Sequence, residues 1–157
     1  MAKTDRDAGS YQFRSRARRR VLQALYQWQI AGHSADEIIK QFLEEQSWER
    51  VDQAYFKLLL NESIREAETI TRGLQAFLDR PAEQVDYLER SILQLAATEL
   101  LYHTDIPYRV VLNEAIDLAK RFGAENSHCY VNAVLDKAAK QWRCEEIKAE
   151  TEPAGDD

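Results

Sequence analysis

Apolar residues recur along most of the chain at intervals of three and four, the spacing that places side chains on one face of an α-helix. The first such stretch follows an arginine run, keeps Leu22 and Leu25 on one face, and reaches Gly32, which suits a helix end. Ser34-x-x-Glu37 then has the form of a capping box and predicts a short second helix. No segment alternates between apolar and polar residues for long, so the pattern predicts an all-α fold.

The longest helical pattern runs from residue 52 to residue 78. It predicts one amphipathic helix of about seven turns with a kink near Gly73. Arg80-Pro81 then interrupts the pattern, because proline disfavours helical angles in the residue before it. We expect this break to divide the chain into two halves that pack as one unit.

Three more helices are predicted after the break. Asp86 can cap the first, Pro107 precedes the second, and either Asn126 or Ser127 can cap the third. The second helix stops at Gly123, where a left-handed cap would suit glycine. The expected fold is therefore all-α, with six to seven helices in two small packed bundles.

The two ends of the chain differ in composition from its middle. The last fourteen residues carry six acidic side chains against one lysine, a composition typical of disorder. The expected organisation is a disordered arm over residues 1–12, one helical domain over residues 13–143 with sub-bundles at about 13–79 and 80–143, and a disordered acidic tail over residues 144–157.

Charge is distributed unevenly along a chain whose formal net charge is −6. Residues 1–20 hold seven Lys or Arg against two acidic residues, whereas the remainder holds fourteen against twenty-five. A basic head on an acidic body suggests two partners, one polyanionic and one basic. The alternative is an unspecific solubilising arm.

Signs of catalysis or metal binding are weak. The five glycines are too scattered for a phosphate-binding loop. Glu125-x-x-His128 has the form of a di-iron ligand pair but lacks a second copy, and Cys129 beside His128 does not face it on a helix. Two cysteines without CxxC spacing fit a reduced cytosolic setting, and no apolar run approaches the roughly 20 residues of a membrane span. We expect no enzyme activity, metal, cofactor or membrane contact.

Arginines and aromatic residues offer a binding function instead. The run that begins at Arg14 could neutralise phosphates, and Tyr130 could stack on an unpaired base. Asn126 and Ser127, at a helix start, could bond a base edge or a phosphate. For Tyr130 alone, half-buried packing is the simpler interpretation.

Several segments resemble the NusB family of bacterial transcription antitermination factors. They are RRRVLQALYQWQ, VDQAYFKLLL, LERSILQLAATELL and DIPYRVVLNEAIDLAKRFGAENSHCYVNAVLDKAA, and together they extend from about Arg14 to Arg143. The resemblance implies a cytoplasmic, all-helical binding protein that recognises single-stranded boxA RNA together with NusE, a small-subunit ribosomal protein. It further implies assembly with RNA polymerase and other Nus factors, notably on ribosomal RNA operons.

The resemblance also assigns residues by position. It implies RNA contacts at Arg14, Arg16, Arg18, Arg19, Asn126, Ser127 and Tyr130, and NusE contacts at Tyr26, Glu83 and Glu89. Family members often carry Asp at the place of Asn126, Lys at that of Cys129 and Phe at that of Tyr130.

Two other interpretations make different demands on the sequence. The same helical module occurs fused to an RNA cytosine methyltransferase domain, which needs a downstream cofactor-binding region. A purely protein-binding adaptor would fit the acidic body and leave the arginine run unexplained. The residues leave open whether the chain is a monomer or a homodimer.

Overall fold

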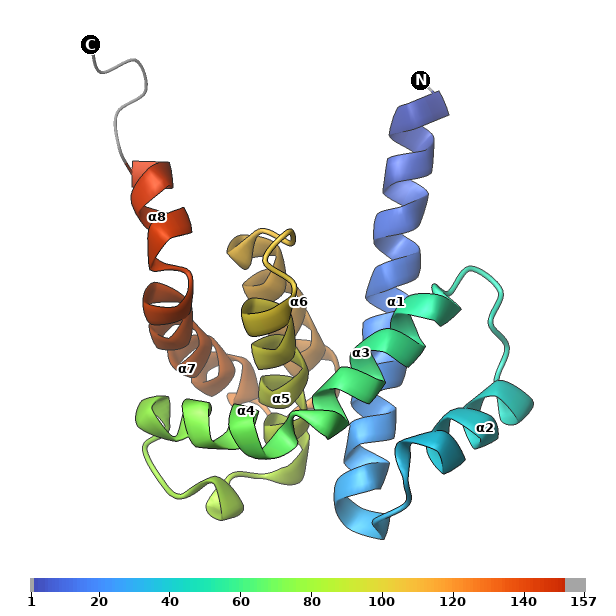
Figure 1. Cartoon of the computed structure of the whole chain (residues 1–157), viewed down its shortest axis with the longest axis horizontal. Helices are drawn as coiled ribbons and strands as arrows, with labels where there is room; N and C mark the ends of the chain where they lie inside the picture. The colour runs from blue at the N-terminus through green and yellow to red at the C-terminus, as the bar shows by residue number, and fades with distance from the viewer. Residues whose placement is uncertain (1, 152–157) are drawn as a thin grey trace.

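A computed structural model describes residues 2–151 of the chain, with side chains from residue 9 onward. This part folds into eight α-helices and two short 3-10 helices and contains no strand (Figure 1). The helices are α1 (Ala2–Ala31), α2 (Ala35–Glu45), α3 (Gln53–Arg65), α4 (Ala67–Leu74), η1 (Gln75–Phe77), η2 (Ala82–Gln84), α5 (Tyr87–Tyr102), α6 (Tyr108–Phe122), α7 (Ser127–Trp142) and α8 (Cys144–Thr151). The all-α prediction is confirmed, with one helix more than the expected six to seven.

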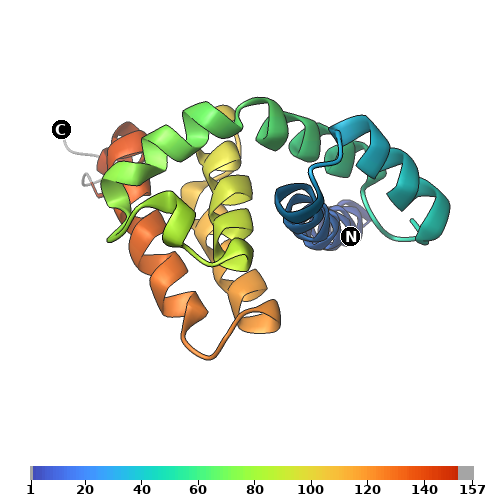
Figure 2. The same ribbon diagram turned by 90° about the horizontal axis from the view of Figure 1, so that it is seen from below.

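Helix α5 forms the centre of the molecule. Every residue from Ser91 to Leu100 is buried, and α5 contacts α1, α3, α4, α6 and α7. A helix that is buried on all sides belongs in a core. Figure 2 shows α1, α2 and α3 gathered on one side of α5, with α6 and α7 on the other.

The expected single helix over residues 52–78 is divided in the structure. It breaks at Glu66, between α3 and α4, and not near Gly73. Beyond the break, α4 packs on α5 and η1 packs on α7, where Phe77 meets Trp142 edge-on at 5.6 Å between ring centroids. The break in this helix therefore lies about fourteen residues before the Arg80-Pro81 break that the sequence suggested.

Two glycines end helices in different ways. Gly32 has a φ of 73°, so it ends α1 in the left-handed conformation that suits glycine. Gly123 has a φ of −91°, and the expected left-handed cap is wrong. A Cβ atom there would lie 2.7 Å from both the carbonyl oxygen of Ala119 and the Cβ of Ser127. Glycine is thus required at position 123 by the close approach of α7 to the end of α6.

Helix α1 begins earlier than expected, because it includes residues 2–12, the segment predicted as an arm. Two contacts hold this end of the helix. Tyr11 donates a hydrogen bond to Glu114 of α6 at 3.1 Å, and the backbone N–H of Asp52 donates to the carbonyl of Phe13 at 3.1 Å. Met1 lies outside the described residues.

The acidic segment after residue 143 also differs from the expected disorder, because Cys144–Thr151 forms helix α8. Glu146 accepts a hydrogen bond from the backbone N–H of Tyr108 at 2.9 Å and pairs with Arg143 at 2.5 Å. Arg143 in turn donates to carbonyls at the end of α5, including that of Leu100. Acidity here serves a specific contact with the start of α6, which composition alone could not indicate. Residues 152–157 of the predicted tail lie outside the described residues.

Candidate nucleic-acid interface

The arginine run lies on α1, and helix geometry spreads its side chains around the helix. Successive residues on an α-helix are about 100° apart, so the side chains of Arg14 and Arg16 point to nearly opposite sides of α1, roughly 160° apart. Arg18 lies one turn before Val21 and Leu22, on the face that enters the core. The run therefore does not present one continuous basic surface.

Arg18 is a core residue in this structure, with 1% of its surface exposed. Its Nε lies 2.8 Å from a carboxylate oxygen of Glu99, itself 1% exposed, and its Nη1 lies 2.9 Å from Glu114. Both carboxylates hold the guanidinium away from solvent. This burial argues against the RNA contact expected of Arg18, whose side chain joins α1 to α5 and α6.

Tyr55 of α3 completes the buried network. Its hydroxyl donates to Glu99, and burial together with the negative charge of Glu99 raises the pKa of Tyr55 above its ordinary value. The Arg14 guanidinium lies 4.3 Å from the centre of the Tyr55 ring. Arg14 therefore occupies the rim of this network, on the opposite side of α1 from Arg16.

Arg16 and Arg19 remain on the outer side of α1 and are half-buried. Arg16 donates to the carbonyl oxygen of Arg50 at 3.1 Å. The pKa of Arg19 is lowered, first by burial and then by the positive charges of Arg121 and Arg16. Arg19 thus lies within electrostatic range of a second guanidinium group on α1 and a third on α6, while Glu114 and Asp117 act in the opposite direction.

The start of α7 carries the second set of expected RNA contacts. Asn126 is exposed, and its side chain makes no capping hydrogen bond. Ser127 is 5% exposed beneath Gly123, so its position is structural. Tyr130 is half-buried, its hydroxyl has no hydrogen-bond partner among the described side chains, and the Arg80 guanidinium lies 4.9 Å from its ring centre. Tyr130 is therefore a half-buried packing residue in this structure, the alternative that the sequence left open.

The expected NusE contacts lie next to this region. Tyr26 is 41% exposed and lines a groove between α1, α2 and the end of α6. Glu83 is exposed on η2, and Glu89 is half-buried on the first turn of α5. Asp86 lines the same groove as Tyr26, so one carboxylate shares the groove with this aromatic side chain.

The structure brings some of these residues together and separates others. Arg19 and Tyr26, both on α1, line one groove together with Asp86 from the start of α5, so a residue expected at RNA and one expected at NusE lie in the same groove. Tyr130 lies instead near Asp79 and Glu89. Burial raises the pKa of Tyr130, and the negative charges of Asp79 and Glu89 raise it further. Sequence reasoning missed the basic end of α6, although the letters KRF at residues 120–122 were a visible signal.

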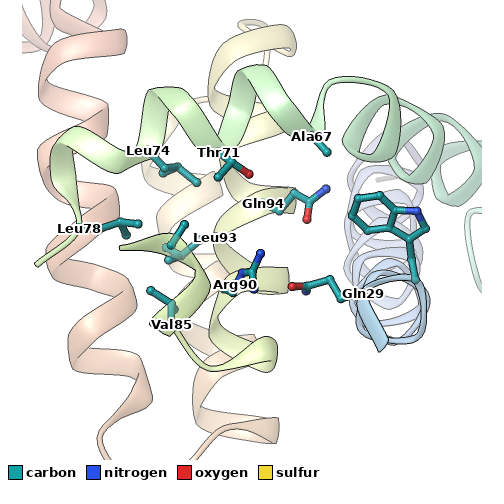
Figure 3. A pocket seen from close by; sticks show the side chains of 11 residues that line it. Gln29, Ala67, Thr71, Leu74, Leu78, Val85, Arg90, Leu93 and Gln94 are labelled. Atoms are coloured by element: carbon teal, nitrogen blue, oxygen red, sulfur yellow. The ribbon is translucent and has the colours of Figure 1, made fainter. Parts of the chain in front are cut away.

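A separate small cavity of about 90 Å³ lies between the two halves of the fold (Figure 3). Two of its polar side chains already have partners: Gln29 donates to the carbonyl of Tyr87 at 3.1 Å, and Gln94 donates to the carbonyl of Ser63 at 2.7 Å. The remaining walls include Leu93 and other apolar side chains. This cavity is an imperfectly filled packing gap between α1, α4 and α5.

The described residues offer neither a membrane span nor a cluster of metal ligands. None of the helices in this part of the chain is both long and apolar enough to cross a bilayer. No group of three or more His, Cys, Asp or Glu side chains in the same part could hold a metal ion, and Glu125 and His128 gain no further ligand.

Comparison with known sequences gives a consistent family. A sequence model of the NusB family matches residues 15–140. The transcription antitermination protein NusB of Xanthomonas campestris pv. campestris (strain B100) is 55% identical over 130 residues, covering 83% of this chain and 82% of that protein. The corresponding protein of Xanthomonas axonopodis pv. citri (strain 306) shows the same identity and coverage. Antitermination is a regulatory and not a catalytic role, so the expectation of a non-enzymatic protein is confirmed at the level of the family.

Solved structures agree with the sequence comparison. T. maritima NusB aligns with a TM-score of 0.73 and 28% identity, covering 85% of this chain and 96% of that one. NusB in a crystal structure of the antitermination factors NusB and NusE with double-stranded RNA aligns with a TM-score of 0.73 and 27% identity, covering 82% and 96%.

Proposed function

This chain belongs to the NusB family, and on that premise we propose that it binds boxA RNA together with NusE as a transcription antitermination factor. The observation that carries the proposal is the groove along α1, which Arg19 and Tyr26 both line. Arg19 of the proposed RNA surface and Tyr26 of the proposed protein surface thus lie on one helix, and Asp86 at the start of α5 adds a carboxylate to the same groove. The related NusB and NusE crystallised with RNA support the same pair of partners.

The RNA surface that we propose is smaller than the one assigned by sequence. Arg16 and Arg19 supply the positive charge, and exposed Asn126 supplies an amide for a base edge. Arg14 lies against the Tyr55 ring on the far side of α1 from Arg16, so we leave it out of this surface. Arg18 is excluded because its guanidinium is buried between two carboxylates.

The protein surface that we propose comprises Tyr26, Glu83 and Glu89, with Asp86 and the exposed Tyr87 beside them. Carboxylates around an aromatic side chain complement a basic partner such as a ribosomal protein, and such charge complementarity favours the correct orientation and rapid association.

The test is fluorescence anisotropy of a labelled boxA RNA titrated with this protein, with and without NusE, over a series of salt concentrations. We expect weak binding alone and tighter binding by the pair. Replacing Arg16→Gln should flatten the dependence of log K on log salt by about 0.7 on single-stranded RNA, because one phosphate contact is lost. If NusE neither binds the protein nor raises RNA affinity, the proposal fails.

A charge reversal separates the two surfaces. Glu89→Lys should weaken NusE binding and leave the weak RNA binding of the free protein unchanged, since no RNA contact is assigned to Glu89. Arg72→Gln, at an exposed position of α4, is the control and should change neither NusE binding nor RNA binding. Equal loss of both activities in Glu89→Lys would indicate misfolding, which circular dichroism can detect.

We further propose that the chain acts in the bacterial cytoplasm, with RNA polymerase and other Nus factors as larger partners. Family membership supports this proposal. Co-purification of the NusE complex with transcribing RNA polymerase, compared with and without boxA in the transcript, would test it.

A further inference from the structure

The last turn of α6 presents basic and aromatic side chains to solvent. Lys120 and Arg121 are exposed, and 48% of the Phe122 surface is accessible. Large aromatic side chains are usually buried, so an open phenyl ring beside cations indicates a binding surface. Phe122 lines the groove that also contains Arg19 and Tyr26.

The cations of this surface form no ion pair with a described side chain, although Arg16 donates to the backbone carbonyl of Arg50. No described carboxylate lies within 4.0 Å of a guanidinium nitrogen of Arg16, Arg19 or Arg121. Two acidic residues of α6 lie near these cations. Glu114 is already bonded to Arg18 at 2.9 Å and accepts from the Tyr11 hydroxyl, and Asp117 lines the cleft beside Arg16 and Arg19 without forming an ion pair with either. The charges of Arg121 and Arg16 contribute to the lowered pKa of Arg19, after burial. Arg19 thus lies near two other cations whose charges Glu114 and Asp117 offset only in part, and a bound anion would offset the remainder.

Geometry joins the cations to the ring. Arg16 and Arg19 line a cleft between α1 and α6 together with Asp117, and Arg121 follows Asp117 by four residues, one turn along the same face of α6. Arg19 also lines the adjoining groove that contains Phe122. A strand of nucleic acid on this surface would meet phosphate-binding and base-stacking groups in succession.

We propose that Arg121 and Phe122 belong to the RNA site, with Arg121 binding a backbone phosphate beside Arg16 and Arg19, and Phe122 stacking on an unpaired base. This inference rests on the proposed RNA-binding function. It moves the main aromatic platform from Tyr130 to Phe122. The Tyr130 ring is half-buried and covered by Arg80, whereas the Phe122 ring is open.

Two variants test the inference in complexes with NusE, using labelled boxA RNA and anisotropy. Arg121→Gln should reduce the slope of log K against log salt by about 0.7. Phe122→Leu should weaken RNA binding roughly 5- to 150-fold, the range that corresponds to the loss of one stacked base, and leave the slope unchanged. Phe122 lies at the surface, so both variants should melt at the wild-type temperature.

Matched controls are Arg72→Gln and Tyr102→Leu, an exposed cation on α4 and an exposed aromatic at the end of α5. In Figure 2, α4 lies at the opposite edge of the molecule from the turn between α6 and α7. Neither control should alter RNA affinity or its salt dependence.

Three results would overturn the inference. If both test variants bind RNA like the controls while Arg16→Gln loses affinity, the RNA surface ends at α1 and the proposed function stands. If Phe122→Leu weakens NusE binding measured without RNA, the ring belongs to the protein interface. If the wild-type pair does not bind boxA RNA at all, the proposed function and this inference fail together.

Discussion

Replacing Arg18→Met should destabilise the fold without removing an RNA contact. The substitution leaves Glu99, which is 1% exposed, without its cation. Removing one partner of a buried ion pair costs about 3–5 kcal/mol, because the remaining charge stays desolvated. In a protein of 157 residues this loss lowers the melting temperature by about 6–20 °C.

Thermal denaturation followed by circular dichroism measures this loss, and anisotropy with boxA RNA below both melting temperatures measures binding. Arg16→Gln is the control: it should change stability by less than about 0.5 kcal/mol and weaken RNA binding. The double variant Arg18→Met/Glu99→Leu should recover much of the stability, since both charges leave the core together. An Arg18→Met protein with wild-type stability and reduced RNA affinity would refute the reasoning and restore Arg18 to the RNA surface.

Three further predictions concern the frame around the candidate site. Gly123→Ala should cost about 1–3 kcal/mol in urea unfolding, because its Cβ would lie 2.7 Å from backbone and side-chain atoms, whereas Gly9→Ala, with nothing within 4 Å, should stabilise the helix; equal effects would contradict the close approach. Glu146→Gln should cost about 1 kcal/mol by weakening the contact that caps α6, while Glu150→Gln, in an exposed pair, should leave the melting temperature unchanged. Because the pKa of Tyr55 is raised in the fold, its contribution to stability is complete below about pH 10 and declines above it, so the stability advantage of wild type over Tyr55→Phe should shrink between pH 9 and 11.

The helical class and the end of α1 at Gly32 could be predicted because both depend on local patterns. The break at Glu66 could not, since neither glycine nor proline marks it. It reflects the packing of α4 on α5, a contact between segments that are distant in sequence. The same limit applies to α8, whose acidic composition resembles disorder until Arg143 and the start of α6 are seen beside it.

In the candidate site, too, some features could be predicted from local sequence patterns and others depend on contacts between distant residues. Arg18 shares a helix face with Val21, Leu22 and Leu25, so its burial could have been suspected from the sequence. Its partner Glu99 lies 81 residues away, and no spacing rule links the two. Exposed Phe122 was missed because an apolar residue at the end of a helical pattern is ordinarily assigned to the core.

Because α1 is one unbroken helix, it can support cooperative binding of RNA and protein. Arg19 and Tyr26 are seven residues apart on one unbroken helix, about 10 Å along its axis. An RNA strand held at Arg19 and a protein held at Tyr26 would then touch directly. Each ligand would raise the effective concentration of the other, because α1 holds both at a fixed separation. This cooperation would need no conformational change in the chain.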